Sequence, residues 1–506
     1  MGLAWCGPRP GKGAPDRQRH ALRRRPYQAR HRFLARYRRG EFAVMSAATT
    51  IPADRVPTAP GALPVVGHVP ALLRSPLPLF ASLSEHGDVV RLRLGSRPIY
   101  YLTNAELIHT MLVKQAEQLD KGKIFERSQA FLGNGLATTD NEFHIGQRRL
   151  IQPAFVPGRL PGYVTLIREQ AEAAISGWRP GKPLQFARVM NELALNVISV
   201  LVFSRHLSQA DFAAVRGATP HILKGMILRT VYPSSRFERL PIPANRRFDT
   251  AVETLHELTG RVIEEGRSGG DLGDNVMSLL LSAEDPRTGK PMDPRQIRDE
   301  VMTMLIGGSE TTALQMAWLF HELSLNPAIA ERVYAENREV LGGRPCEYED
   351  VGRMPYLRQV VLETVRRHTL TWLVMRRTRA EFTLGDIRFP EGTELVFSPT
   401  TIHRDPRLYP DPMRFDPDRW LPEAMRERPR SSFIPFGAGR RKCIGDALAL
   451  LEVTVVAATI MTRWRLAAAS TGEVGENVLS AAVAPTNLVL RPEPLDSAAT
   501  AGGGRS

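Results

Sequence analysis

A long helical pattern over residues 294–325 constrains the fold more than any other feature of this sequence. Asp293 and Pro294 supply an N-cap and a first-turn proline, apolar side chains recur along the segment, and Asn326-Pro327 ends it. A helix of about 30 residues is roughly 45 Å long. Because that length spans a large domain, we expect the remaining chain to pack around this one helix.

The other periodic segments predict a mainly α protein with small β-sheets, an α+β class. Helical patterns dominate from about residue 104 to residue 375 and are divided by prolines. Strands are predicted at residues 89–94 and 99–102, joined by a turn at residues 95–98, and a second β region is predicted at residues 381–398.

The basic charge of the chain is concentrated at its start. The full sequence of 506 residues has a formal net charge of +14, and residues 1–44 contain 11 Arg and 1 Lys against Asp16 and Glu41, a net of +10. The remaining +4 is ordinary, and a hydrophobic content of 43% excludes a disordered or collagen-like protein. An Arg-rich nucleic-acid-binding tail is one function that this charge leaves open.

The composition divides the chain into three parts. Residues 1–57 are basic and Pro-rich, and we expect a disordered extension there, with Met45 as the true start of the protein. Residues 58–492 are expected to form a single domain, and residues 493–506 a disordered tail.

The cysteine and hydropathy patterns indicate a cytoplasmic protein. Three cysteines, Cys6, Cys346 and Cys443, are too few and too scattered for a disulfide framework or a zinc site. The longest apolar runs, residues 193–203 and 447–461, are shorter than the roughly 20 residues that a membrane-spanning helix needs. We therefore expect no membrane span.

A glycine-rich loop around Cys443 is the strongest candidate for a reactive site. The sequence FGAGRRKCIG, residues 436–445, precedes an apolar helical stretch. Glycines permit tight turns and close approach to a flat ligand, while basic neighbours and a helix N-terminus favour a thiolate over a thiol. Such a thiolate is a soft axial ligand for haem iron. An inert buried cysteine is the alternative.

Paired glycines, Gly307 and Gly308, lie in the middle of the long helical pattern. Each costs on the order of 1 kcal/mol relative to Ala, so helix propensity does not explain them. A local opening of the helix would leave room for a small ligand and turn Glu310 and Thr311 toward it as proton-delivery groups. Close packing of a second helix on the glycines is the alternative.

Glu363 and Arg366 lie three residues apart on one helix face. At a protein surface such a pair contributes only about 0.2 to 0.5 kcal/mol, so the spacing alone carries little weight. Arg419, in the sequence FDPDRW at residues 415–420, is the candidate that would complete a buried network of one carboxylate and two guanidinium groups.

The sequence GRSGG at residues 266–270 leaves a serine hydrolase built on Ser268 open as a competing function. A nucleophile elbow of this type requires a preceding strand. Residues 258–265 have a helical pattern instead, so we interpret the motif as a loop.

Taken together and in order, these elements resemble the cytochromes P450 across residues 58–492. The Cys443 loop matches the family pattern Phe-Gly-x-Gly-x-Arg-x-Cys-x-Gly at every fixed position, and Glu363 and Arg366 match its Glu-x-x-Arg motif. Residues 307–311 match the oxygen-binding segment of the central helix, and Arg419 matches the arginine that binds the Glu-x-x-Arg pair. The resemblance implies the cytochrome P450 fold, in which a long central helix crosses over the haem.

The resemblance also implies which residues bind haem b. Cys443 would be the axial ligand of the iron, and His144 and Arg148 stand where bacterial members hold a haem propionate. Arg376 stands where another propionate ligand follows the Glu-x-x-Arg helix, with Arg377 beside it as an alternative. The complete expected cofactor-binding set is Cys443, His144, Arg148, Arg376, Arg441 and Phe436.

The chemistry implied by the resemblance is that of a monooxygenase, which uses two electrons and two protons to cleave O2. The Cys443 thiolate would push electron density onto the iron to favour that cleavage. Thr311, backed by Glu310, would relay the protons.

The expected partners follow from the same resemblance. Electrons from NAD(P)H would arrive through a separate ferredoxin and ferredoxin reductase, docking at the basic residues Arg440, Arg441 and Lys442. We expect a monomer that binds an apolar small molecule and O2, and no nucleic acid.

The substrate is suggested by local strings rather than by a motif. Residues 63–68, 149–155 and 240–248, together with Trp372, resemble actinobacterial P450s that oxidise sesquiterpenes. The resemblance implies sequential oxidation of a cyclic sesquiterpene such as pentalenene in antibiotic or terpenoid biosynthesis. Fatty acid or polyketide hydroxylation is the runner-up.

Overall fold

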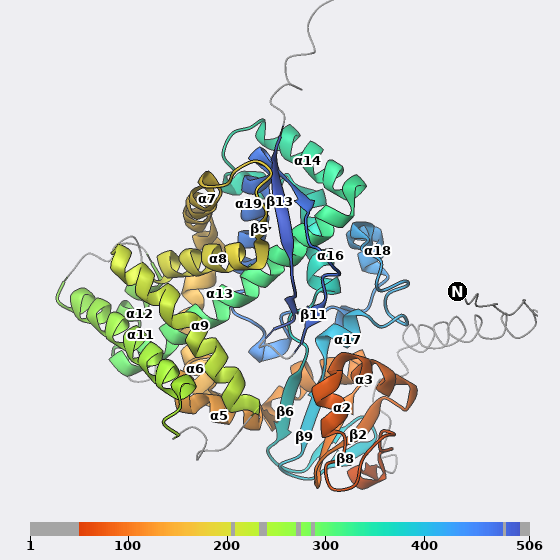
Figure 1. Ribbon diagram of the computed structural model, residues 1–506. Coiled ribbons are helices and arrows are strands. Elements are labelled where there is room, and N and C mark those ends of the chain that lie inside the picture. Colours follow the sequence, from red (N-terminus) through yellow and green to blue (C-terminus); the bar gives the residue numbers. More distant parts are fainter. Residues whose placement is uncertain are drawn as a thin grey trace, which may run out of the picture.

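A computed structural model describes residues 50–203, 208–231, 240–269, 275–284, 289–478 and 482–495. Helices dominate this part of the chain, and small sheets lie both at one end of it and among the helices (Figure 1). The predicted fold class, mainly α with small β-sheets, is confirmed. The helices are α2 Val69–Arg74, α3 Pro76–Ser82, α4 Ala105–His109, α5 Lys123–Leu132, α6 Asn141–Ile151, α7 Leu160–Ser176, α8 Phe186–Phe203, α9 Gln209–Val231, α11 Pro243–Arg267, α12 Val276–Ser282, α13 Pro294–Leu325, α14 Pro327–Leu341, α15 Tyr348–Val351, α16 Pro355–Arg367, α17 Pro399–His403, α18 Pro422–Arg426 and α19 Asp446–Arg463.

Helix α13 is the predicted long helix, and it runs through the middle of the helical region (Figure 1). The Asp293 side chain caps it by accepting a hydrogen bond from the backbone N–H of Arg295 at 2.8 Å. The N-terminal half of α13 packs in one apolar cluster with α9, α11 and α12, whereas its C-terminal half packs in a second with α7, α14, α16 and α19. The two clusters that form the helical core therefore share α13.

The glycine pair does not open the helix, because α13 is continuous from Pro294 to Leu325. A Cβ atom on Gly308 would lie 2.9 Å from Cδ1 of Ile198 in α8, so Gly308 permits close packing of two helices. A Cβ atom on Gly307 would meet nothing within 4 Å. The packing alternative is thus right for Gly308, whereas Gly307 borders open space.

The largest sheet lies beside α2 and α3 and has the strand order β2-β3-β9-β6-β4. The predicted antiparallel pair is confirmed, with Val89 opposite Leu102 and Leu94 opposite Arg97. The second strand begins two residues earlier than predicted, since Gly95, at φ +65°, lets a two-residue turn reverse the chain. The five strands are β2 Val89–Leu94, β3 Arg97–Leu102, β4 Leu119–Asp120, β6 Val374–Thr378 and β9 Glu394–Phe397.

The smaller sheets correct both ends of the predicted domain. Ile51 pairs with Ile387 as a parallel edge strand, and Ala53 and Val56 are buried, so residues 50–57 belong to the fold. At the other end, Trp464 pairs with Pro494, which extends the fold past residue 492. Residues 1–49 and 496–506, including Met45, lie outside the described residues. The sheets are β1-β8-β7, β10-β13-β5 and β11-β12, formed by β1 Ile51–Pro52, β5 Leu184–Gln185, β7 Phe382–Leu384, β8 Ile387–Phe389, β10 Trp464–Ala468, β11 Glu476–Asn477, β12 Ala484–Pro485 and β13 Val489–Pro494.

Across the described ranges, only α8 is long and apolar enough to span a bilayer, and 67% of it is buried inside the fold. Its Met190, Leu193 and Val197 side chains contribute to the helical core beside α13 and α7. A buried core helix has the same composition as a membrane helix.

Candidate functional site

The Cys443 loop is a closed turn in front of α19. The backbone N–H of Cys443 donates to the carbonyl oxygen of Phe436 at 2.9 Å, which joins the two ends of the loop. Gly437 and Gly439 have φ values of +71° and +68°, conformations that side chains disfavour. A Cβ atom on Gly439 would also lie 2.1 Å from the carbonyl oxygen of Leu112. The loop therefore requires glycine at this position.

The Cys443 side chain is exposed, although the surrounding protein raises the pKa of its thiol. Desolvation by the protein atoms around the thiol, which is open on one side only, is the main cause of the higher pKa, and the charge of Asp446 adds to it. The N–H of Gly445 and the charges of Arg148 and Lys442 lower the pKa by less. The expected helix N-terminus and basic neighbours therefore do act on this thiol, and desolvation opposes them. A bound metal ion would remove the thiol proton directly.

Buried basic side chains gather near this loop. Lys121, His144 and Arg376 are at most 8% exposed, and the Arg441 side chain is 4% exposed. Burial lowers the pKa of Lys121 to about 7 and that of Arg376 to about 10, and Arg441 lowers both further. Burial and then the charges of Lys121, Arg441 and Arg148 lower the pKa of His144 to about 3, so this imidazole is neutral. The cluster has more positive than negative charge and suits an anionic ligand.

Arg376 and Arg377 point in different directions from β6. Arg377 pairs with Glu126 and lies 3.8 Å from Asp120 at the surface. Arg376 donates to the carbonyl oxygen of Met375 at 2.7 Å and has no ion pair with any described residue. A fully buried guanidinium without a carboxylate partner is costly, so Arg376, rather than Arg377, is the candidate to bind an anion.

Arg441 and Arg148 connect the Cys443 loop to the neighbouring segments. Arg441 donates to the carbonyl oxygens of Ala116 and Leu119 and pairs with Asp140 at 2.9 Å, while its Nε is buried with no partner among the described residues. Arg148 donates to the carbonyl oxygen of Lys442 at 2.7 Å. Because Arg441 faces inward, the expectation that it docks an electron donor is wrong.

The residues of α13 nearest its centre differ in exposure. Gly307 and Thr311, one turn apart, are exposed, whereas Ser309 and Thr312 are buried and Glu310 is half-buried. The Thr311 hydroxyl donates to the carbonyl oxygen of Gly307 at 2.7 Å. One face of the helix therefore presents a hydroxyl group to open space.

Glu363, Arg366 and Arg419 meet in a buried network. The Arg366 guanidinium donates to both oxygens of Glu363, at 2.7 and 2.9 Å, and Arg419 lies 3.3 Å from one of them. The indole of Trp420 and the backbone N–H of Asp416 also donate to this carboxylate, each at 3.0 Å. The carboxylate is fully satisfied by these donors.

His403 connects this network to the Cys443 loop. Arg366 donates to the carbonyl oxygen of His403 at 2.8 Å. Burial lowers the pKa of His403 far below its usual value, so the ring is neutral. Its Nε2 accepts from the N–H of Ile434 at 2.9 Å, which leaves Nδ1–H to donate to Thr369. Ile434 is two residues before the start of the loop.

Ser268 does not form a nucleophile elbow. It follows the 25-residue helix α11 as its C-cap rather than a strand, and its N–H donates to the carbonyl oxygen of Glu264. Residues 270–274 lie outside the described part. The interpretation of this motif as a nucleophile elbow is therefore wrong, because a helix and not a strand precedes Ser268.

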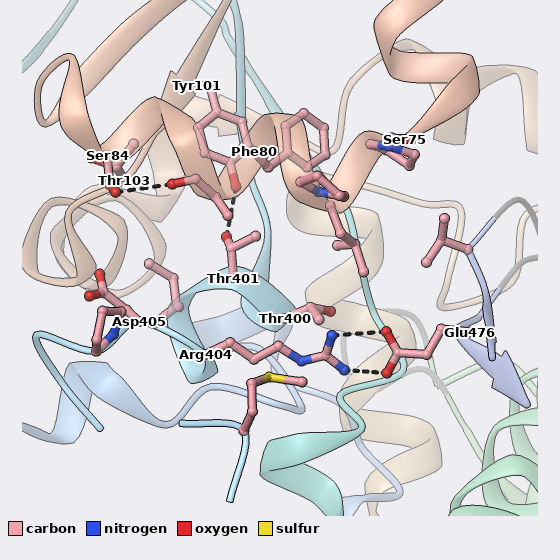
Figure 2. Close-up of a pocket in the computed structure, with 18 of the residues that line it drawn as sticks. Ser75, Phe80, Ser84, Tyr101, Thr103, Thr400, Thr401, Arg404, Asp405 and Glu476 are labelled. Carbon is pink, nitrogen blue, oxygen red and sulfur yellow. Dashed lines mark hydrogen bonds and ion pairs between the residues drawn. The ribbon is translucent and has the colours of Figure 1, made fainter. Parts of the chain in front are cut away.

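A pocket of about 510 Å³ lies elsewhere, between α3, β3, α17 and β11 (Figure 2). Figure 2 shows Arg404 bound to Glu476 by two parallel contacts at its edge and Tyr101 hydrogen-bonded to Thr401. No residue of α13 or of the Cys443 loop lines this pocket. It is not the candidate catalytic site.

The comparisons with known proteins define the class of this chain. The family model for cytochrome P450 matches residues 57–494. The solved haem domain of cytochrome P450DA has a TM-score of 0.79 and 24% identity, and covers 89% of this chain and 99% of that one. The chain belongs to the cytochrome P450 family and has its fold. It is a haem-dependent oxidoreductase, a monooxygenase that takes electrons from a redox partner.

Its relatives include Streptomyces enzymes. A cyclooctat-9-en-7-ol 5-monooxygenase of Streptomyces melanosporofaciens is 41% identical over 81% of this chain and 89% of the relative. Cyclooctatin synthase of the same organism is 40% identical. Pentalenene oxygenase of Streptomyces avermitilis is 35% identical over 86% of this chain and 96% of the relative.

Sequence reasoning missed Lys121, Asp140 and His403. Each lies in a short segment without a strong pattern and acts through residues far away in the chain, such as Lys121 near Arg441. The only sequence signal was their polarity beside apolar residues, which many surface positions share.

The buried network predicts that two ion pairs of similar helical spacing contribute very differently to the free energy of unfolding. Glu363→Gln leaves two guanidinium groups without a compensating charge, and we expect the free energy of unfolding to fall by about 3 to 5 kcal/mol. The pair Arg188–Glu192 has side chains that are 81% and 55% exposed, so Glu192→Gln should change stability by less than about 0.5 kcal/mol. Urea unfolding followed by circular dichroism measures both; equal losses would contradict the network.

Proposed function

We propose that this enzyme inserts one oxygen atom of O2 into a cyclic terpene hydrocarbon or alcohol, with the second oxygen reduced to water. The observation that carries the chemistry is an exposed thiol, Cys443, in a glycine-locked loop beside an excess of buried cations. The terpene substrate is supported by the similarity to the pentalenene and cyclooctat-9-en-7-ol oxygenases.

The residues present fit haem b. Cys443 would bind the iron, and the buried cations Arg376 and Arg441, with Arg148 and the neutral His144, would hold the two propionates. The Arg376 guanidinium has no ion pair with a described residue, and the Nε of Arg441 has no hydrogen-bond partner among them; these are the donors that such carboxylates would satisfy. Phe436 lies at the start of the same loop. Haem, when bound, supplies the activation of O2.

Thr311 and Glu310 would deliver the protons. The Thr311 hydroxyl donates to Gly307, so its oxygen keeps lone pairs that can accept a proton from Glu310 or water. Rotation of the side chain would then release its own hydrogen toward the oxygen that is being reduced. The exposure of Thr311 on α13 supports this relay, because a substrate could reach the hydroxyl group.

The electrons would come from NAD(P)H through a ferredoxin and its reductase in the cytoplasm. With Arg441 turned inward, Arg440 and Lys442 are the basic residues left at the loop surface. They pair with Glu117 and Asp446, and an acidic protein would compete for them.

The substrate pocket would discriminate by shape. A hydrocarbon offers few hydrogen bonds, so apolar walls must exclude water and hold one carbon in place. Ala137 is exposed between the buried residues Leu136 and Thr138 and would form part of such a wall.

Two measurements test the proposal as a whole. Reduced, CO-treated protein should show the absorption band of a thiolate-bound haem, and Cys443→Ala should lack it. Pentalenene should displace water from the iron and change the visible spectrum, and a medium-chain fatty acid should not. A response to the fatty acid alone would reject the terpene substrate, and protein purified without haem would reject the enzyme class.

For Thr311→Ala, we expect haem content and the CO spectrum to be unchanged while the yield of product per NAD(P)H falls by about tenfold. The electrons that are not used for product should appear in hydrogen peroxide, because the hydroxyl group that directs proton delivery is missing. Thr311→Ser keeps the hydroxyl and should restore most of the yield. Unchanged coupling in the alanine variant would remove Thr311 from the relay.

For Arg376→Leu, we expect about tenfold weaker haem retention, because a propionate loses a charged hydrogen-bond donor. Transfer of haem to apomyoglobin measures the rate. Arg377→Leu is the matched control on the same strand, since Arg377 pairs with Glu126 at the surface. Similar rates for the two variants would contradict the assignment.

A further inference from the structure

One face of α13 binds the loop formed by residues 133–139. The side chain of Asp299 accepts from the backbone N–H of Asn134 at 2.8 Å, and that of Glu300 accepts from the N–H of Leu136 at 2.8 Å. Gln296 donates to the carbonyl oxygen of Asn134 at 2.8 Å and to Glu300 at 2.9 Å. Residues 296, 299 and 300 share a helix face, so the three side chains act together.

The loop approaches α13 too closely for any residue with a side chain at positions 133 and 135. A Cβ atom on Gly135 would lie 2.1 Å from Oγ1 of Thr303 and 2.6 Å from the carbonyl oxygen of Asp299. Gly133 has a φ of +71°, and its Cβ atom would lie 2.2 Å from the Asp299 carboxyl carbon. Two glycines thus let the loop backbone reach the carboxylates of α13.

Lys121 holds the same loop from its other side. Its ammonium group donates to the carbonyl oxygens of Leu136 and Ala137 at 2.7 and 2.8 Å. The backbone of Leu136 is therefore fixed at its N–H by Glu300 and at its C=O by Lys121. Glu300 is 0% exposed and Lys121 is 6% exposed, so both polar groups depend on these bonds.

The charges of Glu300 and Lys121 connect the loop electrostatically to its surroundings. Burial raises the pKa of Glu300 to about 7, and the N–H of Leu136, Gln296 and the charge of Lys121 oppose the shift. Lys121 also lies within the electrostatic range of Arg441 and Arg376. The loop is consequently linked to the cationic cluster as well as to α13.

The loop borders the face of α13 that carries Thr311. Glu300, Gly307 and Thr311 are separated by seven and four residues, spacings that align them on one side of a helix. Gly307, Thr311 and Ala137 are exposed, and Ala137 lies between the buried residues Leu136 and Thr138. Leu136 packs into the same apolar cluster as Ile198 and Leu305.

We propose that Glu300 is a positioning residue: by fixing the backbone of Leu136 it sets the distance between the Leu136–Ala137 wall and Thr311, and so determines which ligand shapes the site accepts. This inference rests on the proposed function for its substrate, but it concerns a contact that no motif of the family pattern above includes. Glu300 touches neither substrate nor cofactor and acts through Leu136.

The haem-containing enzyme tests this with two iron-binding probes. 4-Phenylimidazole fills the space above the iron and imidazole does not. In Glu300→Ala we expect the spectral dissociation constant for 4-phenylimidazole to change by about tenfold and that for imidazole by less than about twofold. Hydrogen exchange at the amides of residues 134–139 should accelerate. Glu300→Gln keeps an oxygen acceptor and should behave like the wild type.

A surface carboxylate provides the control. Glu264 is exposed on α11, and Glu264→Gln should leave both probes and the exchange rates unchanged. If Glu300→Ala loses its haem, Gln296→Ala removes two of the same hydrogen bonds and should shift 4-phenylimidazole binding by a smaller factor. Equal weakening of both probes, or wild-type exchange in a folded variant, would overturn the proposal. Failure of the terpene substrate would appear as absent turnover in the wild type and would not affect these measurements.

Discussion

The carboxylate of Glu363 is the interaction on which the rest of the site depends. It is 0% exposed and accepts hydrogen bonds from α16, from the segment before α18 and from Trp420. Residues between β9 and α19 form few regular elements, so side-chain bonds must fix their path. Through Arg366 and His403 the same network reaches Ile434, two residues before the Cys443 loop. A single buried anion thereby helps to fix the chain segment that leads into the loop.

The buried cations are the second constraint on the site. Arg376 and Lys121 repel Arg441, and each loses hydration by being inside the fold. Such a cluster destabilises the protein when no anion is bound, and a bound anion reduces the repulsion between its charges. A ligand that carries two carboxylates would therefore add to the stability of the fold. Binding and folding are coupled at this place.

Much of the architecture could be predicted because its signals are local. The capped helix at Pro294, the alternating strand at Val89 and the glycine-rich loop at Cys443 each occupy one short window of sequence. The predictions that failed concerned residues whose partners lie far away in the sequence. Whether Gly308 opened its helix or packed depended on Ile198, over 100 residues away, and Ile51 formed a strand only because the edge of β8 was free to pair with it. The acidity of Cys443 likewise depends on how many protein atoms surround the thiol, which composition does not reveal.

The central position of α13 has a consequence for the order of folding. Its two halves belong to clusters built from helices on both sides of it in the chain, and one of these clusters needs α19, which ends at Arg463. During synthesis, α13 leaves the ribosome long before α19 exists. The part of its C-terminal half that packs on α19 therefore stays uncovered until about nine-tenths of the chain has been made, and late-synthesised α19 closes the core. Nascent chains that stall before this helix would be the form most prone to aggregate.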